Sequence, residues 1–315
     1  RCLAGDTTIM NPASGALISL EDLYRNRNRA GEVLSLEPSQ KIQPRLIADV
    51  TYNGRKPVWK ITTRSGRAIR ATANHPILTP QGWRKLEEIG VGAKLAVPRI
   101  VSGPRSPLAV KRHKLGLLGY LLAEGNFCHP HGFYFYSKSR EEINDYLRYL
   151  ETFTNTIGRS DERKAVVAVY AKRKNPKRLS GAVWWIERLG LKYKKATEKF
   201  FPDFVYRLPN NDLALLLAKM FQGDGCISLK RGDPQIFYAT SSPTIARGLQ
   251  HLLLRFGILS TIHEKKFKYR GRIKPGYTIT VNRYDNIRKF IGAFGSHLVG
   301  QKATAVKEIA TTHPI

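Results

Sequence analysis

The pattern of apolar and polar positions divides the chain into two parts. Before residue 98, short β-branched runs at 32–36, 57–63 and 67–72 alternate with turn residues, and one short helix is expected near 20–24. This pattern predicts an all-β first region.

After residue 108 the apolar positions recur mostly at helical spacing, with strand-like runs between them. Helices are expected at 115–122, 143–150, 182–189, 213–221 and 245–256. Strands are expected at 132–136, 165–170, 236–239 and 277–281. We therefore expect a mixed α+β second region, separated from the first by a Pro/Gly/Ser-rich linker at 99–108.

The second region repeats itself. LLGYLLAEG at 117–125 and LAKMFQGDG at 217–225 both run an apolar helix into an acid followed by glycine. FYFYSKSREEI at 133–143 and QIFYATSSPTI at 235–245 then both give an aromatic strand, a serine-rich turn and the start of a helix. Two recurrences in the same order predict a duplicated unit, whose two apolar helices pair about a pseudo-twofold axis.

Composition adds a strong positive charge to this picture. The 315 residues carry 53 Lys and Arg against 24 Asp and Glu, a net charge of +29. Residues 1–98 hold 15 basic and 8 acidic side chains, which leaves 38 and 16 for residues 99–315. A folded domain with this much positive charge indicates a polyanionic partner. Nucleic acid is favoured over an anionic membrane surface. The longest apolar run, 115–123, is less than half of the roughly twenty residues that a spanning helix needs, so no membrane segment is expected.

Glu124 and Asp224 end the two repeated helices, each directly before a glycine. If the helices pair at their small residues, the two carboxylates meet at the axis and repel each other unless a cation lies between them. Mg²⁺ or Mn²⁺ would relieve this repulsion, and paired acids in a basic domain favour metal-assisted phosphodiester hydrolysis. For a single copy, the alternative is an ordinary helix C-cap with an exposed acid.

These two segments resemble the signature helices of LAGLIDADG homing endonucleases. The residues shared with the family string are Leu217, Ala218, Asp224 and Gly225 in the second copy, and Leu117, Gly119, Ala123 and Gly125 in the first. The departures are Glu124 in place of Asp, Gly223 in place of alanine, and Lys219 where the family prefers glycine. The last of these puts the close packing of the helices in question at that position.

The resemblance implies a double-stranded DNA substrate with a long recognition site. Glu124 and Asp224 would be metal-binding catalytic residues that each serve one strand, and antiparallel sheets would track the major groove. The family often places a lysine near each acid. Lys199, in a block that resembles Lys-x-x-Pro, is one candidate, and Lys265 or Lys266 is the expected counterpart.

Two basic stretches interleaved with aromatic and β-branched residues are expected to face the groove. Their charged residues are Lys164, Lys172, Arg173 and Lys174 in the first half, and Lys268, Arg270, Arg272 and Lys274 in the second. For any one of these, the alternative is a solvated strand face.

The first region resembles inteins. CLAGDTT from Cys2 resembles their opening block, and TANHP from Thr72 resembles their TxxH block. The resemblance implies a Hint-type all-β splicing fold, with the endonuclease inserted after the TxxH block. Cys2 would take the acyl group of the preceding residue in an N-to-S shift, while Thr72 hydrogen-bonds the peptide and His75 protonates the leaving nitrogen. Taken singly, Cys2 is also an ordinary small buried residue and His75 an ordinary surface histidine.

The expected organisation is a splicing region at 1–98, the linker at 99–108, endonuclease halves at 109–208 and 209–293, and a return segment at 294–315 towards the splicing region. The chain closes on THPI without the terminal His-Asn of inteins. We therefore expect a C-terminal intein fragment as a partner. Without it, the acyl shift at Cys2 is expected to be weak and ligation of the flanks absent.

The further partners expected are the host-protein flanks, or exteins, with the chain itself monomeric. Three widely separated cysteines favour a reducing, cytoplasmic location. A Cys-His-Pro-His run at 128–131 lacks a second ligand pair and is not expected to bind zinc. Two alternatives stay open: a splicing element whose endonuclease domain binds DNA without cutting it, and an RNA-binding maturase.

Overall fold

The computed structural model describes residues 2–26, 31–269 and 271–313. The chain forms two compact units, one of Arg1–Leu108 with Asp203–Pro209 and the other of Ala109–Pro202 with Asn210–Ile315. Within the described residues, no helix is long and apolar enough to cross a membrane.

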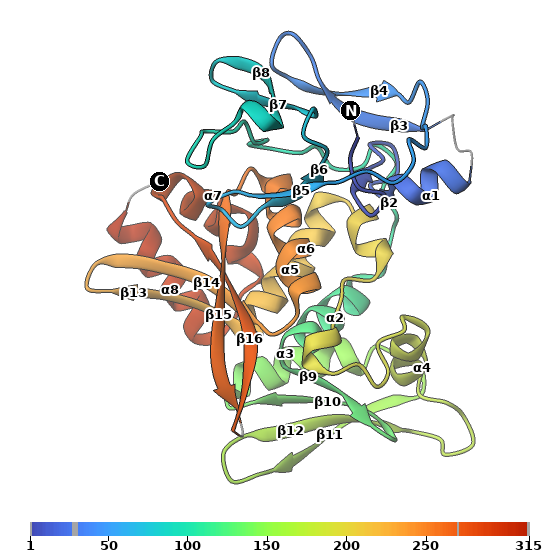
Figure 1. Cartoon of the computed structure of the whole chain (residues 1–315). Coiled ribbons are helices and arrows are strands. Elements are labelled where there is room, and N and C mark those ends of the chain that lie inside the picture. The colour runs from blue at the N-terminus through green and yellow to red at the C-terminus, as the bar shows by residue number, and fades with distance from the viewer. Residues whose placement is uncertain (1, 27–30, 270, 314–315) are drawn as a thin grey trace. The chain divides into compact units, whose positions relative to one another are not determined.

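The first unit is built from short antiparallel strand pairs, β1–β2, β3–β4, β5–β6 and β7–β8 (Figure 1). Its elements are β1 Thr8–Met10, β2 Leu17–Ser19, α1 Leu20–Arg25, β3 Glu32–Leu36, β4 Ile42–Leu46, β5 Trp59–Thr62, β6 Ala68–Ala71, β7 Pro76–Thr79, β8 Gly82–Lys85, and 3₁₀ turns at Leu86–Glu88 and Asp203–Arg207. The unit thus consists of small antiparallel sheets and short helices, among them the helix expected near residues 20–24. Strands this short make few ladder hydrogen bonds before a turn interrupts them.

The expected linker at 99–108 is part of the first unit. Val101 is buried, and the Ser106 backbone N–H donates to the Ala13 carbonyl over 2.8 Å. The Leu108 N–H donates to the Arg207 carbonyl, also over 2.8 Å. These bonds attach both this segment and the 3₁₀ turn at Asp203–Arg207 to the unit. Asp203–Pro209, which we expected within the endonuclease halves, thus belongs to the first unit.

The second unit contains two successive sets of elements in the same order. The first set is α2 Arg112–Glu124, β9 Gly125–His129, β10 Gly132–Ser137, α3 Arg140–Leu150, β11 Thr156–Glu162, β12 Val167–Arg173, α4 Gly181–Arg188 and a 3₁₀ turn at Ala196–Glu198. The second set is α5 Asn210–Asp224, β13 Gly225–Lys230, β14 Asp233–Thr240, α6 Pro243–Leu253, a 3₁₀ turn at Leu254–Phe256, β15 Ser260–Tyr269, β16 Arg272–Val281, α7 Tyr284–Phe294, a 3₁₀ turn at Gly295–His297 and α8 Gly300–Thr312.

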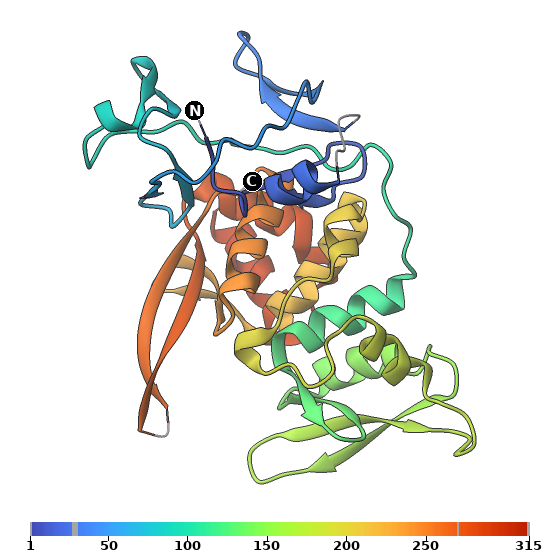
Figure 2. The same ribbon diagram turned by 45° about the vertical axis from the view of Figure 1, so that its right-hand side comes forward.

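Each set forms one four-stranded antiparallel sheet with the same strand order. The first sheet runs β11-β12-β10-β9 and the second runs β15-β16-β14-β13. In both sheets, the third strand in chain order (β11 or β15) lies at one edge, and the first strand (β9 or β13) lies at the other. Figure 2 shows β15 and β16 as a long hairpin that extends away from the helices of its own half.

The helices α2 and α5 form the core of the second unit. Residues 115–123 of α2 and 213–222 of α5 are all buried, as expected of helices that are apolar on every side. In contrast, α3 and α6 bury one face each and begin at matching serine caps. Ser139 accepts the Glu142 N–H and Ser242 accepts the Ile245 N–H.

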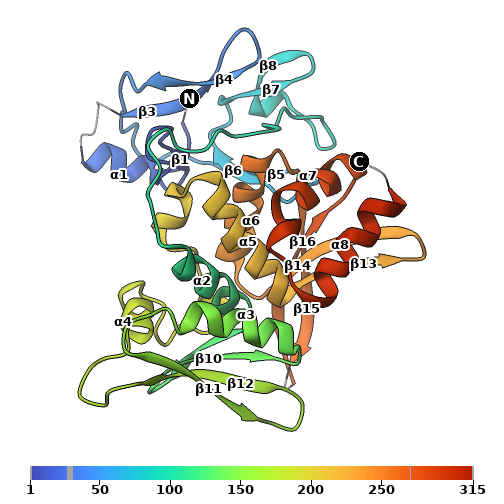
Figure 3. The ribbon, with the colours of Figure 1, turned by 180° about the vertical axis from the view of Figure 1, so that it is seen from behind.

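The last described residues belong to the second unit. We expected 294–315 to return towards the first region, but Gly300–Thr312 forms α8, which packs on β13 and beside α7 (Figure 3). Val306 and Ile309 are the buried residues of this helix. Burial of these two apolar side chains stabilises the packing of α8 within the second unit.

Candidate active site

The close contact between α2 and α5 depends on glycines. A Cβ atom on Gly119 would lie 2.5 Å from the Leu216 carbonyl oxygen, and one on Gly223 would lie 2.6 Å from the Ala123 Cβ. Both distances are well inside normal packing, so the two backbones approach as closely as they do only because these side chains are absent. Lys219 does not separate the helices, since Gly119 makes room for its Cβ.

This contact brings Glu124 and Asp224 together at the carboxyl ends of α2 and α5. Burial raises the pKa of Glu124 to about 7, and the neighbouring Asp224 charge adds to this effect, while Lys199 opposes it. Because Glu124 is still exposed on one side, water moderates the repulsion between the two acids. Two oxygen donors in such proximity form a site that favours a hard divalent cation.

Lys199 caps the end of α2. Its Nζ donates to the carbonyl oxygens of Leu121, Leu122 and Ala123 over 3.1, 3.0 and 2.6 Å. Burial lowers the pKa of Lys199 to about 8, against the opposing charges of Asp224 and Glu124. The ammonium group thus satisfies carbonyls that a helix end leaves without partners and places a positive charge beside the two acids.

Lys302, in α8, caps the end of α5 in the same way. Its Nζ donates to the carbonyl oxygens of Phe221, Gln222 and Gly223, with the first and third bonds both 3.0 Å long. Burial lowers the pKa of Lys302, and nearby acids including Asp224 oppose this. The two halves therefore each place one lysine at the end of one acid-bearing helix, Lys199 buried and Lys302 half-buried.

Lys302 replaces Lys265 and Lys266 as the counterpart of Lys199. Lys265 and Lys266 lie exposed on β15, opposite Gly276 and Pro275 of β16. The sequence did contain a signal for Lys302, because 78 residues separate Lys199 from Leu121 and 81 separate Lys302 from Phe221. The spacing within the repeat indicates the lysine that caps α5, whereas local charge density pointed to β15.

The residues expected to bind DNA lie at the ends of the two sheets. Lys172 and Arg173 are exposed at the end of β12 and Lys174 follows them, while Lys164 lies in the turn at its other end, between β11 and β12. In the second half, Lys268 is exposed on β15 and Lys274 is half-buried on β16. Arg272 begins β16, and Arg270 lies outside the described residues.

An aromatic surface on the first sheet was not predicted. Tyr134 and Tyr136 of β10 lie on the face of the sheet opposite the buried Phe133 and Phe135, and Tyr134 pairs with Tyr170 of β12. The Arg163 guanidinium lies 5.6 Å from the ring centres of both Tyr134 and Tyr136. The strict alternation in FYFYS was the available signal, since one face of a half-buried strand is exposed.

A second cluster, in the first unit, holds Cys2, Thr72 and His75. The Cys2 N–H donates to the Thr72 Oγ1 over 3.0 Å, and the Thr72 N–H donates back to the Cys2 carbonyl over 3.0 Å. The His75 N–H donates to the Thr72 carbonyl over 2.9 Å, and all three residues line one open cavity of about 1100 Å³. The backbone therefore brings Cys2 next to Thr72 and His75, which lie about seventy positions further along the sequence.

Among the described residues, no three His, Cys, Asp or Glu side chains are grouped so that they could hold a metal ion. Cys128 instead places its Sγ 3.6 Å from the carbonyls of Tyr193 and Lys194.

Comparison with known proteins finds a family resemblance over part of the chain. Residues 211–295, which include the second copy of the repeat, match the model of the LAGLIDADG-like domain. The chain is also 31% identical over 312 residues to the replicative DNA helicase DnaB of Rhodothermus marinus, covering 96% of this chain and 32% of the helicase. The chain thus spans about a third of the length of that relative.

Two solved structures are also similar. A DnaB intein from Synechocystis sp. PCC 6803 is 34% identical, with 31% of this chain and 68% of that chain covered and a TM-score of 0.29. The homing endonuclease I-DmoI in complex with DNA and Ca is 12% identical, with 62% of this chain and 97% of that chain covered and a TM-score of 0.42.

Proposed function

We propose that the second unit is a homing endonuclease of the LAGLIDADG type that cleaves double-stranded DNA with a divalent metal. The observation that carries this proposal is the meeting of Glu124 and Asp224 at two helix ends, each capped by a lysine. The LAGLIDADG-like match over 211–295 supports it, because the matched segment includes Asp224. The net charge of +29 fits a polyanionic substrate.

The residues present fit Mg²⁺ or Mn²⁺. Glu124 and Asp224 supply hard oxygen donors, and their mutual repulsion falls when a cation binds between them. Further oxygen ligands would come from water and DNA phosphates. When bound, the metal would activate a water molecule and stabilise the leaving oxygen of the phosphodiester.

The chain's own residues hold and orient that reaction. The acids lie at helix C-termini, where the backbone carries partial negative charge and would disfavour a second anion. Lys199 and Lys302 neutralise those helix ends through the carbonyls that they bind. Their positive charges also favour the approach of a DNA phosphate to the two carboxylates. The tyrosine face with Arg163, and the basic residues at the sheet ends, are the surfaces proposed to contact a long duplex site.

The test uses a library of randomised DNA duplexes with Mg²⁺ or Mn²⁺ supplied. The wild-type chain is expected to linearise plasmids that carry a subset of the sequences, while Glu124→Gln and Asp224→Asn bind the same duplexes and do not linearise them. Duplex binding without cleavage by the wild-type chain would favour the inactive DNA-binding alternative. Preference for RNA over duplex DNA would favour the maturase alternative.

A second function is proposed for the first unit, which we infer to be a splicing domain. The hydrogen bond from the Cys2 N–H to Thr72 Oγ1 favours it, because that nitrogen leaves in an N-to-S acyl shift. The Cys2 Sγ would bond to the preceding carbonyl carbon, the C–N bond would break, and His75 would protonate the released amine. This function also implies host flanks, a C-terminal intein piece and a reducing cytoplasm, and the DnaB match suggests a replicative helicase as the host.

A chain with a longer N-terminal extension tests the acyl shift. Hydroxylamine should release the extension, Cys2→Ala should stop the release, and His75→Ala should slow it. Cys226→Ala is the matched control, since Cys226 is an unpaired thiol in the second unit. Release that persists in Cys2→Ala would overturn the assignment.

A further inference from the structure

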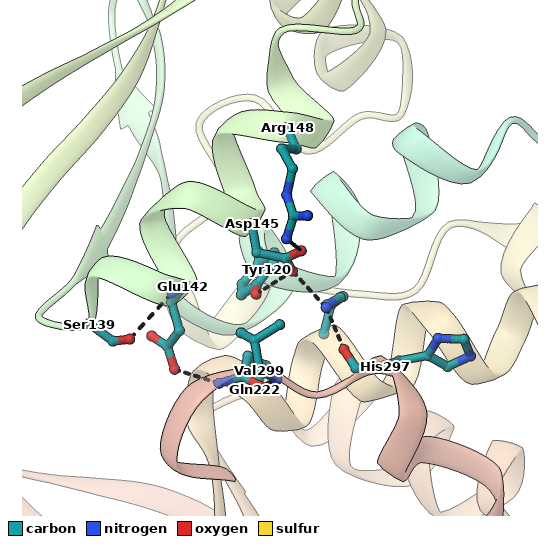
Figure 4. Close-up of polar contacts among 9 residues, drawn as sticks. Tyr120, Ser139, Glu142, Asp145, Arg148, Gln222, His297 and Val299 are labelled. Atoms are coloured by element: carbon teal, nitrogen blue, oxygen red, sulfur yellow. Dashed lines mark hydrogen bonds and ion pairs between the residues drawn. The ribbon is translucent and has the colours of Figure 1, made fainter. Parts of the chain in front are cut away.

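The interface between the two halves of the second unit contains a buried ion pair. The side chains of Lys219 in α5 and Asp145 in α3 are 2% and 6% exposed. The Lys219 Nζ lies 2.6 Å from the Asp145 Oδ2. The same Asp145 oxygen accepts the Tyr120 hydroxyl over 2.8 Å, and its other oxygen accepts Arg148 over 2.8 Å (Figure 4). Lys219 also donates to the carbonyl of His297.

A second polar contact lies one turn further along α5. The Gln222 Nε2 donates to the Glu142 Oε1 over 2.8 Å, and the other Glu142 oxygen accepts the Ser137 hydroxyl over 2.5 Å. The Gln222 Oε1 accepts the Val299 backbone N–H over 2.9 Å (Figure 4). Gln222 is therefore bonded both to α3 and to the segment that leads into α8.

The two contacts match in geometry. Residues 142 and 145 are neighbours on one face of α3, and residues 219 and 222 are neighbours on one face of α5, because positions three apart share a helix face. In the aligned first copy, the positions of Lys219 and Gln222 are taken by Gly119 and Leu122. The contacts therefore run in one direction only, from α5 of the second half to α3 of the first.

Both contacts end close to the proposed site of the second half. Gln222 is two residues before Asp224, and its own carbonyl is bound by Lys302. His297 and Val299, which Lys219 and Gln222 bind, directly precede α8, the helix that carries Lys302. In α2 the matching positions hold Gly119 and Leu122, which carry no polar side chain that could make the same two contacts.

We propose that Lys219 and Gln222 are positioning residues that hold α5 and residues 297–302 on α3, and so fix Asp224 and Lys302 relative to Glu124. This inference rests on the proposed endonuclease function. If each acid serves one strand, a shift of α5 disturbs the strand served by Asp224 more than the strand served by Glu124. Loss of the contacts should therefore convert a double-strand cutter into an enzyme that accumulates nicked DNA.

The first experiment follows nicking and linearisation of a supercoiled plasmid that carries a duplex cut by the wild-type chain. Gln222→Leu is expected to slow cleavage of one strand about tenfold to a hundredfold, to keep DNA affinity unchanged and to accumulate the nicked form. Lys219→Met should do the same if it folds. Arg112→Met is the matched control, since it removes an ion pair of 3.1 Å between α2 and Asp212 of α5 at the other end of the helices. Equal slowing of both strands would overturn the positioning role.

The second experiment needs no cleavage, so it separates failure of this inference from failure of the proposed function. Hydrogen–deuterium exchange is measured on the full chain without DNA. In Gln222→Leu, peptides that cover residues 297–302 should exchange about tenfold faster, because the Val299 N–H loses its acceptor. Arg112→Met should leave them unchanged. Wild-type exchange of this segment in Gln222→Leu would overturn the inference, whether or not the chain cuts DNA.

Discussion

The two helices at the centre of the second unit end alike but differ one turn earlier. Both finish in an acid followed by glycine, and both have carbonyls of their last turn bound by a lysine, Lys199 on α2 and Lys302 on α5. Before that end, α2 presents Gly119 and Leu122 where α5 presents Lys219 and Gln222. The shared features are those that the chemistry of two acids requires. The differences make the halves unlike, so that each has only the other as a matching partner.

The largest effect should come from removing either acid. Asp224→Asn and Glu124→Gln should each reduce cleavage of a different strand by roughly a thousandfold, because each loses a proposed metal-binding oxygen. Strand-specific end labels read the two strands separately. Asp233→Asn, at the start of β14, is the control and should cut like wild type. Loss of the same strand in both variants would show that the two halves do not act independently.

The lysine caps should give the next largest effect. Lys302→Met and Lys199→Met should each slow cleavage about a hundredfold with DNA affinity kept, because the positive charge at one helix end is lost. Single-turnover rates at saturating protein measure this. Lys265→Met and Lys266→Met change similar lysines on β15 and should slow cleavage far less. A wild-type cleavage rate in Lys302→Met would show that the two helix ends are not equivalent.

The close approach of the helices predicts a loss of stability. Gly119→Ala places a Cβ 2.5 Å from the Leu216 carbonyl and should lower the free energy of unfolding by about 1–3 kcal/mol. Gly292→Ala in α7 meets no atom within 4 Å and should raise it by about 0.5–1 kcal/mol. Urea denaturation gives both values. A neutral Gly119→Ala would mean that α2 can shift away from α5 without loss.

The smallest effect concerns pH in metal-free protein. The folded chain raises the pKa of Glu124 to about 7 from an ordinary 4.5, so the folded state holds a proton that the unfolded state releases. Stability should therefore fall as pH rises from 4.5 to 7, modestly because Glu124 is partly exposed. Glu124→Gln should weaken the pH dependence of the melting temperature across this window, whereas Asp233→Asn should leave it unchanged. An unchanged slope in Glu124→Gln would remove Glu124 as its source.

Sequence patterns predicted the features that repeat or alternate. The two acid-ended helices, the serine caps of α3 and α6 and the strands β10 and β14 all follow from apolar spacing and turn residues. Strands β9 and β13 did not, because they follow directly on the helix ends and lack a turn of their own. The choice of Lys265 or Lys266 over Lys302 has a different cause. It followed local charge density, whereas the lysine that binds the end of α5 lies 81 residues after Phe221, where only the spacing of the repeat indicates it.

The same cap contacts set an order in which the two halves complete during synthesis. The end of α2 has its partner once residue 199 has left the ribosome, before α5 has emerged. The end of α5 waits for residue 302, and the bond from Lys302 to Phe221 closes a loop of 81 residues. Closing a loop of that length is slow compared with local helix formation. The nascent protein should therefore pass through a stage in which one half is assembled while the carbonyls of α5 are still hydrated.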